Sequence, residues 1–137
     1  MARAADVVVA IAIGSGAGGV ARYLLTSSIS ARAGTSFPLG TFVVNVSGCL
    51  AIGFLMRLML DSGQFSPTTR AFFTTGLCGG FTTFSTFSWE TIAAIEEGAL
   101  RRAALYALSS VVVGLACVWL GSATAQLLLR AMRGQVA

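Results

Sequence analysis

The feature of this sequence that most constrains its fold is a series of four long apolar stretches. Crossing roughly 30 Å of hydrocarbon takes about 20 helical residues, because each residue of an α-helix rises about 1.5 Å. Lipid offers backbone groups no hydrogen-bond partners, so each stretch is expected to be helical. The sequence therefore predicts an all-α integral membrane protein with four transmembrane helices over about 7–29, 37–56, 71–95 and 103–129.

The composition favours a chain that faces lipid rather than water. It is 55% hydrophobic and only 10% charged, whereas soluble domains carry roughly a quarter charged residues. We expect a single transmembrane domain over residues 1–137 and no separate soluble domain. The N-terminal apolar stretch is expected to be the first helix and not a cleaved signal peptide, because Asp6 interrupts its basic region and three more spans follow.

The composition also argues against several functional classes. The net charge of +4 is scattered along the chain, so a nucleic acid partner is not expected. Cys49, Cys78 and Cys117 lie far apart in apolar runs, without the spacing of a metal site or of a disulfide framework. The chain has no histidine and no pattern that pairs a nucleophile with a base, so the sequence does not indicate an enzyme.

The arginines leave the orientation in the membrane open. With four spans, both termini and the middle loop share one side, and the other two loops share the opposite side. The first side carries Arg3, Arg57, Arg70, Arg130 and Arg133, and the second carries Arg32, Arg101 and Arg102. Five arginines against three is a weak bias, so we expect that the chain can insert in either orientation. Because four helices can hardly enclose a polar path, we also expect a homo-oligomer.

The third apolar stretch holds the richest run of candidate functional residues. Gly79-Gly80 weakens a helix through its backbone entropy, and β-branched threonines follow directly. We therefore predict that the third helix is broken in mid-membrane. Exposed carbonyls at such a break are tolerable where they line a cavity or bind a cation. The alternative is a kink that packs against a neighbouring helix.

Aromatic and hydroxyl side chains follow this predicted break. Phe81, Phe84 and Phe87 share one helix face, which is typical of lipid contact or core packing. The functional alternative is that the electropositive edges of the rings face an anion. The neighbouring hydroxyls either donate to that anion or bond back to their own helix. These hydroxyls belong to Thr82, Thr83, Ser85, Thr86 and Ser88.

The second and fourth stretches each place polar side chains on one helix face. Asn45 shares its face with Thr41 and Gly48. An amide in hydrocarbon is costly unless it is paired, so Asn45 is expected either to bond to another helix or to point its NH₂ group into a pore. Tyr106 and Ser110 lie one turn apart, and the same two alternatives stay open for them.

Two charged residues lie within the predicted spans. An ionisable group inside the membrane is expensive and indicates a functional site. Arg22 lies near the end of the first span and Glu90 towards the end of the third. We expect them to mark the two mouths of a pathway.

Three motifs together resemble the bacterial fluoride channel family called Fluc or CrcB. They are Gly79-Gly-Phe-Thr-Thr-Phe-Ser-Thr-Phe-Ser88, Gly40-Thr-Phe-Val-Val-Asn45 and Gly18-Gly-Val-Ala-Arg22. The resemblance extends over the whole chain in length, spans and motif order. It implies an antiparallel, dual-topology homodimer with two pores in the inner membrane. It also implies a passive channel that lets fluoride leave the cell.

The resemblance further implies roles for individual residues, motif by motif. Phe84 and Phe87 would face the anion edge-on, and Asn45 would be a polar pore donor. Gly79 and Thr82 would give backbone carbonyls to a structural Na⁺ on the two-fold axis. Arg22 would shape a positively charged vestibule and Glu90 would lie at the end of the pore. The rest of the implied pore comprises Thr41, Thr83, Ser85, Tyr106 and Ser110.

The residues alone leave rival functions open. A proton-coupled exporter would need a carboxylate at the membrane midplane, and the one carboxylate within a span is Glu90, towards a helix end. An accessory subunit would not need a stripe of hydroxyl and phenyl groups after a backbone break. The pattern therefore favours an anion path, but composition does not separate fluoride from chloride.

Overall fold

The computed structural model describes residues 3–134, so the ends of the predicted domain, 1–2 and 135–137, lie outside the described residues. The described chain begins with two long helices, α1 (Ala4–Ala33) and α2 (Leu39–Ser62). A composite segment follows, formed by α3 (Pro67–Ala71), the π-helical η1 (Phe72–Cys78), α4 (Gly79–Phe81) and α5 (Phe84–Glu96). The last element is the long helix α6 (Leu100–Gly134).

Three of these helices, α1, α2 and α6, are long and apolar enough to cross a membrane. The composite segment from α3 to α5 contains no single helix of that length among the described residues, because its helical path is interrupted. The chain is thus a helical, multi-pass membrane protein with one bent helix. The extent of each span within these helices remains a prediction.

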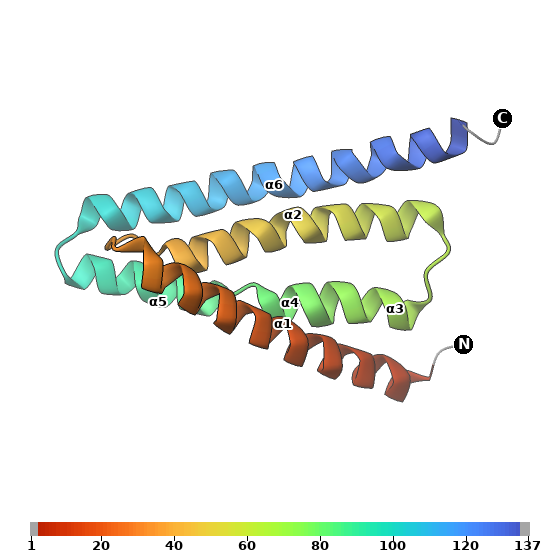
Figure 1. The fold of residues 1–137 in the computed structure, drawn as a ribbon, viewed down its shortest axis with the longest axis horizontal. Coiled ribbons are helices and arrows are strands. Elements are labelled where there is room, and N and C mark those ends of the chain that lie inside the picture. Colours follow the sequence, from red (N-terminus) through yellow and green to blue (C-terminus); the bar gives the residue numbers. More distant parts are fainter. Residues whose placement is uncertain (1–2, 135–137) are drawn as a thin grey trace.

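The helices run back and forth along one direction (Figure 1). Both ends of the described chain lie at the same end of the molecule as the connection between α2 and α3, and the other two connections lie at the opposite end. α2 packs along α6, and α1 crosses over η1 and α4 (Figure 1). Arg57, Arg70, Arg130 and Arg133 therefore share one end of the bundle, as the arginine pattern predicts for a chain of four antiparallel segments.

The crossing of α1 over the composite segment depends on glycine. A Cβ atom at Gly14 would lie 2.5 Å from the carbonyl oxygen of Phe72, and one at Gly80 would lie 2.5 Å from that of Ser15. Real Cβ atoms do not approach backbone so closely. These small residues thus let two backbones touch within one chain, which is the mode of helix packing that membranes favour.

The interior of a single chain is small. Thr41, Val44 and Tyr106 have the largest fully buried side chains. Most large apolar side chains are exposed instead, including Leu115 and Trp119, each 68% exposed. Such a surface would be unfavourable in water, but it suits a helix bundle surrounded by lipid.

The interruption of the third apolar stretch lies slightly later than the glycine pair that we predicted to cause it. Gly79 is helical, with φ −64° and ψ −38°, and Gly80 belongs to the same helical turn. The extended residues are Thr82 (φ −83°, ψ 159°) and Thr83 (φ −148°, ψ 116°). Gly80 is needed for the close contact with α1, and the β-branched threonines leave the helix.

Candidate functional site

The extended turn at Thr82 and Thr83 is held by one side chain from another helix. The Asn45 amide of α2 donates from Nδ2 to the Thr83 carbonyl at 3.0 Å, and its Oδ1 accepts from the Thr83 N–H at 2.7 Å. Backbone groups freed in an apolar environment cost free energy unless they find such partners. Of the two roles expected for Asn45, bonding between helices is therefore one that it performs.

Two carbonyls at the interruption lose their usual helical partners. In a continuous helix, the carbonyl of Gly79 would accept from Thr83 N–H, and that of Thr82 from Thr86 N–H. The Thr83 N–H instead donates to Asn45, and the Thr86 N–H donates to the Thr83 hydroxyl at 3.2 Å. Thr83 thereby caps the N-terminus of α5. The two carbonyls are those that the resemblance assigns to a sodium ion.

A groove of about 300 Å³ opens beside the interruption. It collects residues from α2, the composite segment and α6. Seven of the predicted site residues line it: Asn45, Gly79, Thr82, Thr83, Phe84, Phe87 and Ser110. Its other lining residues are Gly48, Cys49, Ile52, Cys78 and Val111. The structure thus brings together side chains that lie far apart in the sequence.

The two predicted phenylalanines form an aromatic wall of this groove. The ring centroids of Phe84 and Phe87 lie 5.6 Å apart with an interplanar angle of 42°. Phe84 is 80% exposed in the single chain, whereas Phe87 also packs on Tyr106 at a centroid distance of 5.1 Å. The edges of such rings are electropositive, so this wall offers weak attraction to an anion without a fixed cation.

The hydroxyls near the groove fall into two groups. Several bond back to their own helix: Thr82 Oγ1 donates to the Cys78 carbonyl at 3.0 Å, and Ser88 Oγ donates to that of Phe84 at 2.9 Å. The hydroxyl oxygen of Ser110 is buried and has no hydrogen-bond partner within the described chain. Ser110 lines the groove, and its hydroxyl keeps hydrogen-bonding capacity that no group of the described chain uses.

Glu90 joins three helices through its two carboxylate oxygens. Thr41 Oγ1 donates to Oε1 at 2.8 Å, and the Tyr106 hydroxyl donates to Oε2 at 2.7 Å. Thr41 and Tyr106 are each 1% exposed, so these bonds are sheltered from solvent. The two hydroxyl protons point to the carboxylate, and neither side chain is among those that line the groove.

Two further predicted residues lie outside the groove lining. Ser85 is exposed on the first turn of α5, with its Oγ 3.3 Å from Thr83 Oγ1. Arg22 lies on α1 and is partly exposed. Their predicted roles in the pore and in a vestibule remain predictions.

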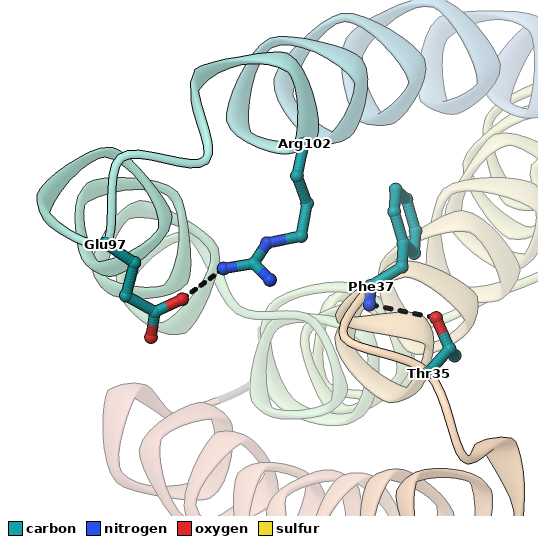
Figure 2. A network of polar contacts seen from close by, with 4 residues as sticks. All are labelled: Thr35, Phe37, Glu97 and Arg102. Carbon is teal, nitrogen blue, oxygen red and sulfur yellow. Dashed lines mark hydrogen bonds and ion pairs between the residues drawn. The ribbon is translucent and has the colours of Figure 1, made fainter.

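The start of α2 fixes the position of Tyr106. The Phe37 N–H donates to Thr35 Oγ1 at 3.1 Å (Figure 2), and the Phe37 carbonyl accepts from the Leu39 N–H at 2.7 Å across Pro38. The φ and ψ of Pro38, −73° and 62°, are those of an inverse γ-turn. This rigid turn places the Phe37 ring edge-on to Tyr106, with centroids 5.4 Å apart.

A second connection closes the same end of the molecule. Arg102, near the start of α6, pairs with Glu97 in the turn after α5 (Figure 2). Glu97 is largely exposed and Arg102 only partly so. The ion pair therefore ties the turn after α5 to the first turn of α6.

One face of α2 supplies four residues of the groove lining. Asn45, Gly48, Cys49 and Ile52 are spaced as one face of α2, and all four line the groove. The sequence pattern predicted a shared face for Asn45 and Gly48, but it did not assign Cys49 and Ile52 to that face. No group of three or more histidine, cysteine or acidic side chains gathers anywhere among residues 3–134, so a cation here would depend on backbone carbonyls.

Comparison with known proteins identifies the family. Residues 9–122 match the family described as CrcB-like protein, Camphor Resistance (CrcB). Three relatives are each named "Fluoride-specific ion channel FluC". The relative from Solibacter usitatus is 48% identical over 85% of this chain and 95% of its own length. Those from Geobacter metallireducens and Roseiflexus are 46% and 45% identical, over 87% and 88% of this chain and 96% and 98% of their own lengths. The chain therefore belongs to the CrcB-like protein family.

Proposed function

We propose that this chain is a fluoride-selective channel through which fluoride leaves the cell passively, lowering its toxicity in the cytoplasm. The observation that carries the proposal is the likeness to relatives named fluoride-specific ion channels, at nearly half identity over most of both chains. These relatives are named as channels and not as enzymes. In this role the protein lies in the inner membrane of a bacterium, surrounded by lipid.

The groove supplies chemistry suited to a small anion. Fluoride holds its water tightly, so a path must replace that water with many weak donors and still let the ion leave. Phe84, Phe87 and Ser110 line this space, and in this proposal the ring edges and the Ser110 hydroxyl, which has no partner within the described chain, turn towards the ion. Asn45 uses one N–H on the Thr83 carbonyl and has a second to offer. Among the described residues, no lysine or arginine lines the groove to trap the ion.

The position of Glu90 weighs against a proton-coupled exporter. Such a transporter exchanges protons for a cationic substrate at a carboxylate that both can reach. The two oxygens of Glu90 accept from Thr41 and Tyr106, which are both buried. The carboxylate acts here as an acceptor that fixes two hydroxyls.

The functional unit in this proposal is an antiparallel homodimer of chains with four spans each and with dual topology. Phe84 leaves most of its ring uncovered in one chain, and a second copy would close the open side of the groove. The weak arginine bias between the two ends permits insertion in both orientations. The segment from α3 to α5 would provide the span that no single helix supplies.

A sodium ion would serve this dimer as a structural cofactor. The carbonyls of Gly79 and Thr82 fit a hard cation, because the donors that would pair with them in a helix are used by Asn45 and Thr83. Carbonyls from two copies would complete the set of oxygen ligands. When bound, the ion would be coordinated by these unpaired carbonyl oxygens and would hold the extended turn in place.

Growth in fluoride tests the proposed efflux. Expression of this chain in a bacterium that lacks its own fluoride exporter is expected to restore growth in fluoride medium. A variant with both groove phenylalanines replaced, Phe84→Ile with Phe87→Ile, serves as the matched control and is expected to restore little. Equal growth with and without the unaltered chain would contradict fluoride efflux.

A further inference from the structure

Two arginines from different helices meet at the end of the molecule that carries both ends of the described chain. Arg57 is the first charged residue of α2, and Arg130 is the first charged residue of α6 after Arg102. Each directly follows a long uncharged run, so both lie where the apolar surface of the bundle ends. This is the level at which phospholipid headgroups meet a membrane protein.

The two guanidinium groups converge on one acceptor. With its amide oriented as its neighbours require, the Gln126 oxygen accepts from Arg57 Nη2 at 3.2 Å and from Arg130 Nη2 at 3.3 Å. Two cations that share a neutral amide oxygen repel each other. The arrangement therefore favours an anion that could contact both forks.

The surrounding residues compensate this charge only in part. Arg57 Nε lies 2.8 Å from Asp61 Oδ2, but its N–H has no hydrogen-bond partner, so attraction of charges alone holds that pair. Arg133 donates to the backbone carbonyl of Asp61 at 3.0 Å and adds a third cation. Among the described residues, Arg57 thus pairs with the Asp61 carboxylate and Arg133 with the Asp61 backbone carbonyl, while the contact given for Arg130 is to the neutral Gln126 amide.

The site borders on apolar surface rather than on a closed pocket. The Arg57 side chain is 40% exposed. Exposed apolar side chains lie within one helical turn of the two arginines on the side of the bundle's middle, with Met56 on α2 and Leu127 on α6. A ligand here would meet cations at one end and hydrocarbon at the other, which describes an amphiphile better than a free ion.

We propose that Arg57 and Arg130 bind the phosphate of an anionic phospholipid at the end of α2 and α6. The planar guanidinium fork matches phosphate oxygens in pairs. Basic positions beside membrane helices attract anionic headgroups through the same charge. The acyl chains would lie along the exposed Met56 and Leu127, and the bound lipid would fasten α2 to α6 at this end. This site is separate from the groove and does not depend on its ligand.

Lipid binding by the purified protein tests the proposal. Phosphatidylglycerol is added to the protein in a zwitterionic detergent, and retained lipid is measured by native mass spectrometry together with the shift in melting temperature. Arg57→Gln and Arg130→Gln are each expected to weaken binding about fivefold, as expected for loss of one basic side chain near an anionic headgroup. Arg57→Lys, which keeps the charge but loses the fork, is expected to retain part of the affinity.

The controls separate this site from general attraction. Arg32→Gln removes an exposed arginine from the opposite end of the molecule and is expected to leave phosphatidylglycerol binding unchanged. Phosphatidylcholine and inorganic phosphate are expected to give little shift with the unaltered chain. Equal binding by the Arg57 and Arg130 variants would overturn the proposal. An equal shift with inorganic phosphate would show a site for soluble anions instead.

Discussion

Asn45 and Glu90 illustrate how single side chains satisfy the polar groups of this apolar protein. Each makes two hydrogen bonds to other segments: Asn45 to the backbone of the extended turn, and Glu90 to two buried hydroxyls. An unpaired amide or carboxylate would be costly in this environment. Both side chains are therefore structural as well as candidates for a role in ion passage.

At the residue scale, the first prediction concerns the two groove phenylalanines. Phe84→Ile and Phe87→Ile keep the hydrophobic character but remove the electropositive ring edge. Contacts between aromatic rings that depend on the same charge distribution are worth about 0.5–1.5 kcal/mol beyond packing. If a ring edge contributes a similar amount to an anion, each variant is expected to lower fluoride flux by up to about tenfold. A fluoride electrode measures the efflux from liposomes.

The matched control for these variants is Phe73→Ile. Phe73 packs on Phe72 at a centroid distance of 4.9 Å and does not line the groove. Its replacement is expected to leave flux unchanged. If Phe84→Ile and Phe87→Ile both conduct fluoride as well as the unaltered chain, the two rings only pack against their neighbours.

The sequence predicted which residues gather at the site better than what each of them does. The spacing of Phe84, Phe87 and Asn45, together with the family motifs, predicted residues that the groove brings together. The bonds from Asn45 to Thr83 join residues that are distant in sequence. The local sequence pattern therefore could not decide whether Asn45 bonds to another helix or points into a pore. The contacts of Glu90 with Thr41 and Tyr106 likewise depend on how three helices pack.

At the scale of elements, glycine has a different role from the one that its sequence position suggests. A Gly-Gly pair followed by threonines predicted an interruption, and the structure has one. Intrinsic propensity could not separate a glycine that breaks a helix from one that permits close packing. The close contact between Gly80 and Ser15 shows that Gly80 permits packing. This contact joins residues that are distant in the sequence, so it becomes visible only in the folded structure.

The second prediction compares two glycines at this scale. Gly80→Ala would place a methyl group 2.5 Å from the Ser15 carbonyl oxygen, so we expect it to lower the free energy of unfolding by about 1–3 kcal/mol. Gly19→Ala is the control, because nothing lies within 4 Å of its added methyl group. We expect it to be neutral or to raise stability by up to about 1 kcal/mol. Equal effects of the two variants on thermal unfolding in detergent would contradict the close crossing of α1 over α4.

The third prediction concerns the proposed sodium ion at the extended turn. A ligand that binds only the folded state raises stability in proportion to the logarithm of its concentration. We therefore expect the melting temperature to rise with Na⁺ and to fall in Na⁺-free buffer of equal ionic strength. N-methyl-D-glucamine, a cation too large for the carbonyls of Gly79 and Thr82 from the two copies to surround, is the control and should not substitute. A melting temperature that follows ionic strength alone would rule out a specific sodium site.

For the whole molecule, four apolar stretches predicted the helical fold, and the described chain runs back and forth as expected. The pattern of three continuous helices and one interrupted segment is also in line with the predicted break. Dimer formation could not be predicted in the same way, because an apolar surface that faces lipid and one that faces a second chain look alike in the sequence and in a single chain. The antiparallel dimer therefore stays a proposal.

The fourth prediction tests that dimer through its topology. Adding two or three lysines to the connection between α5 and α6 should bias insertion towards one orientation, because positive charge in short loops sets topology. Fluoride transport is expected to fall, since antiparallel partners would be lacking. Co-expression with a chain that carries added lysines between α2 and α3 is expected to restore it. Full transport by the first variant alone would show that the functional unit is not antiparallel.

Ion flux from liposomes tests the central claim most directly. Liposomes that contain the purified chain are loaded with equal fluoride and chloride, and efflux of each ion is recorded with no proton gradient and with valinomycin and K⁺ to balance charge. The account predicts rapid fluoride efflux that needs valinomycin, because a passive channel moves net charge, and almost no chloride efflux. Equal efflux of both ions, or fluoride efflux that requires an imposed proton gradient, would contradict it.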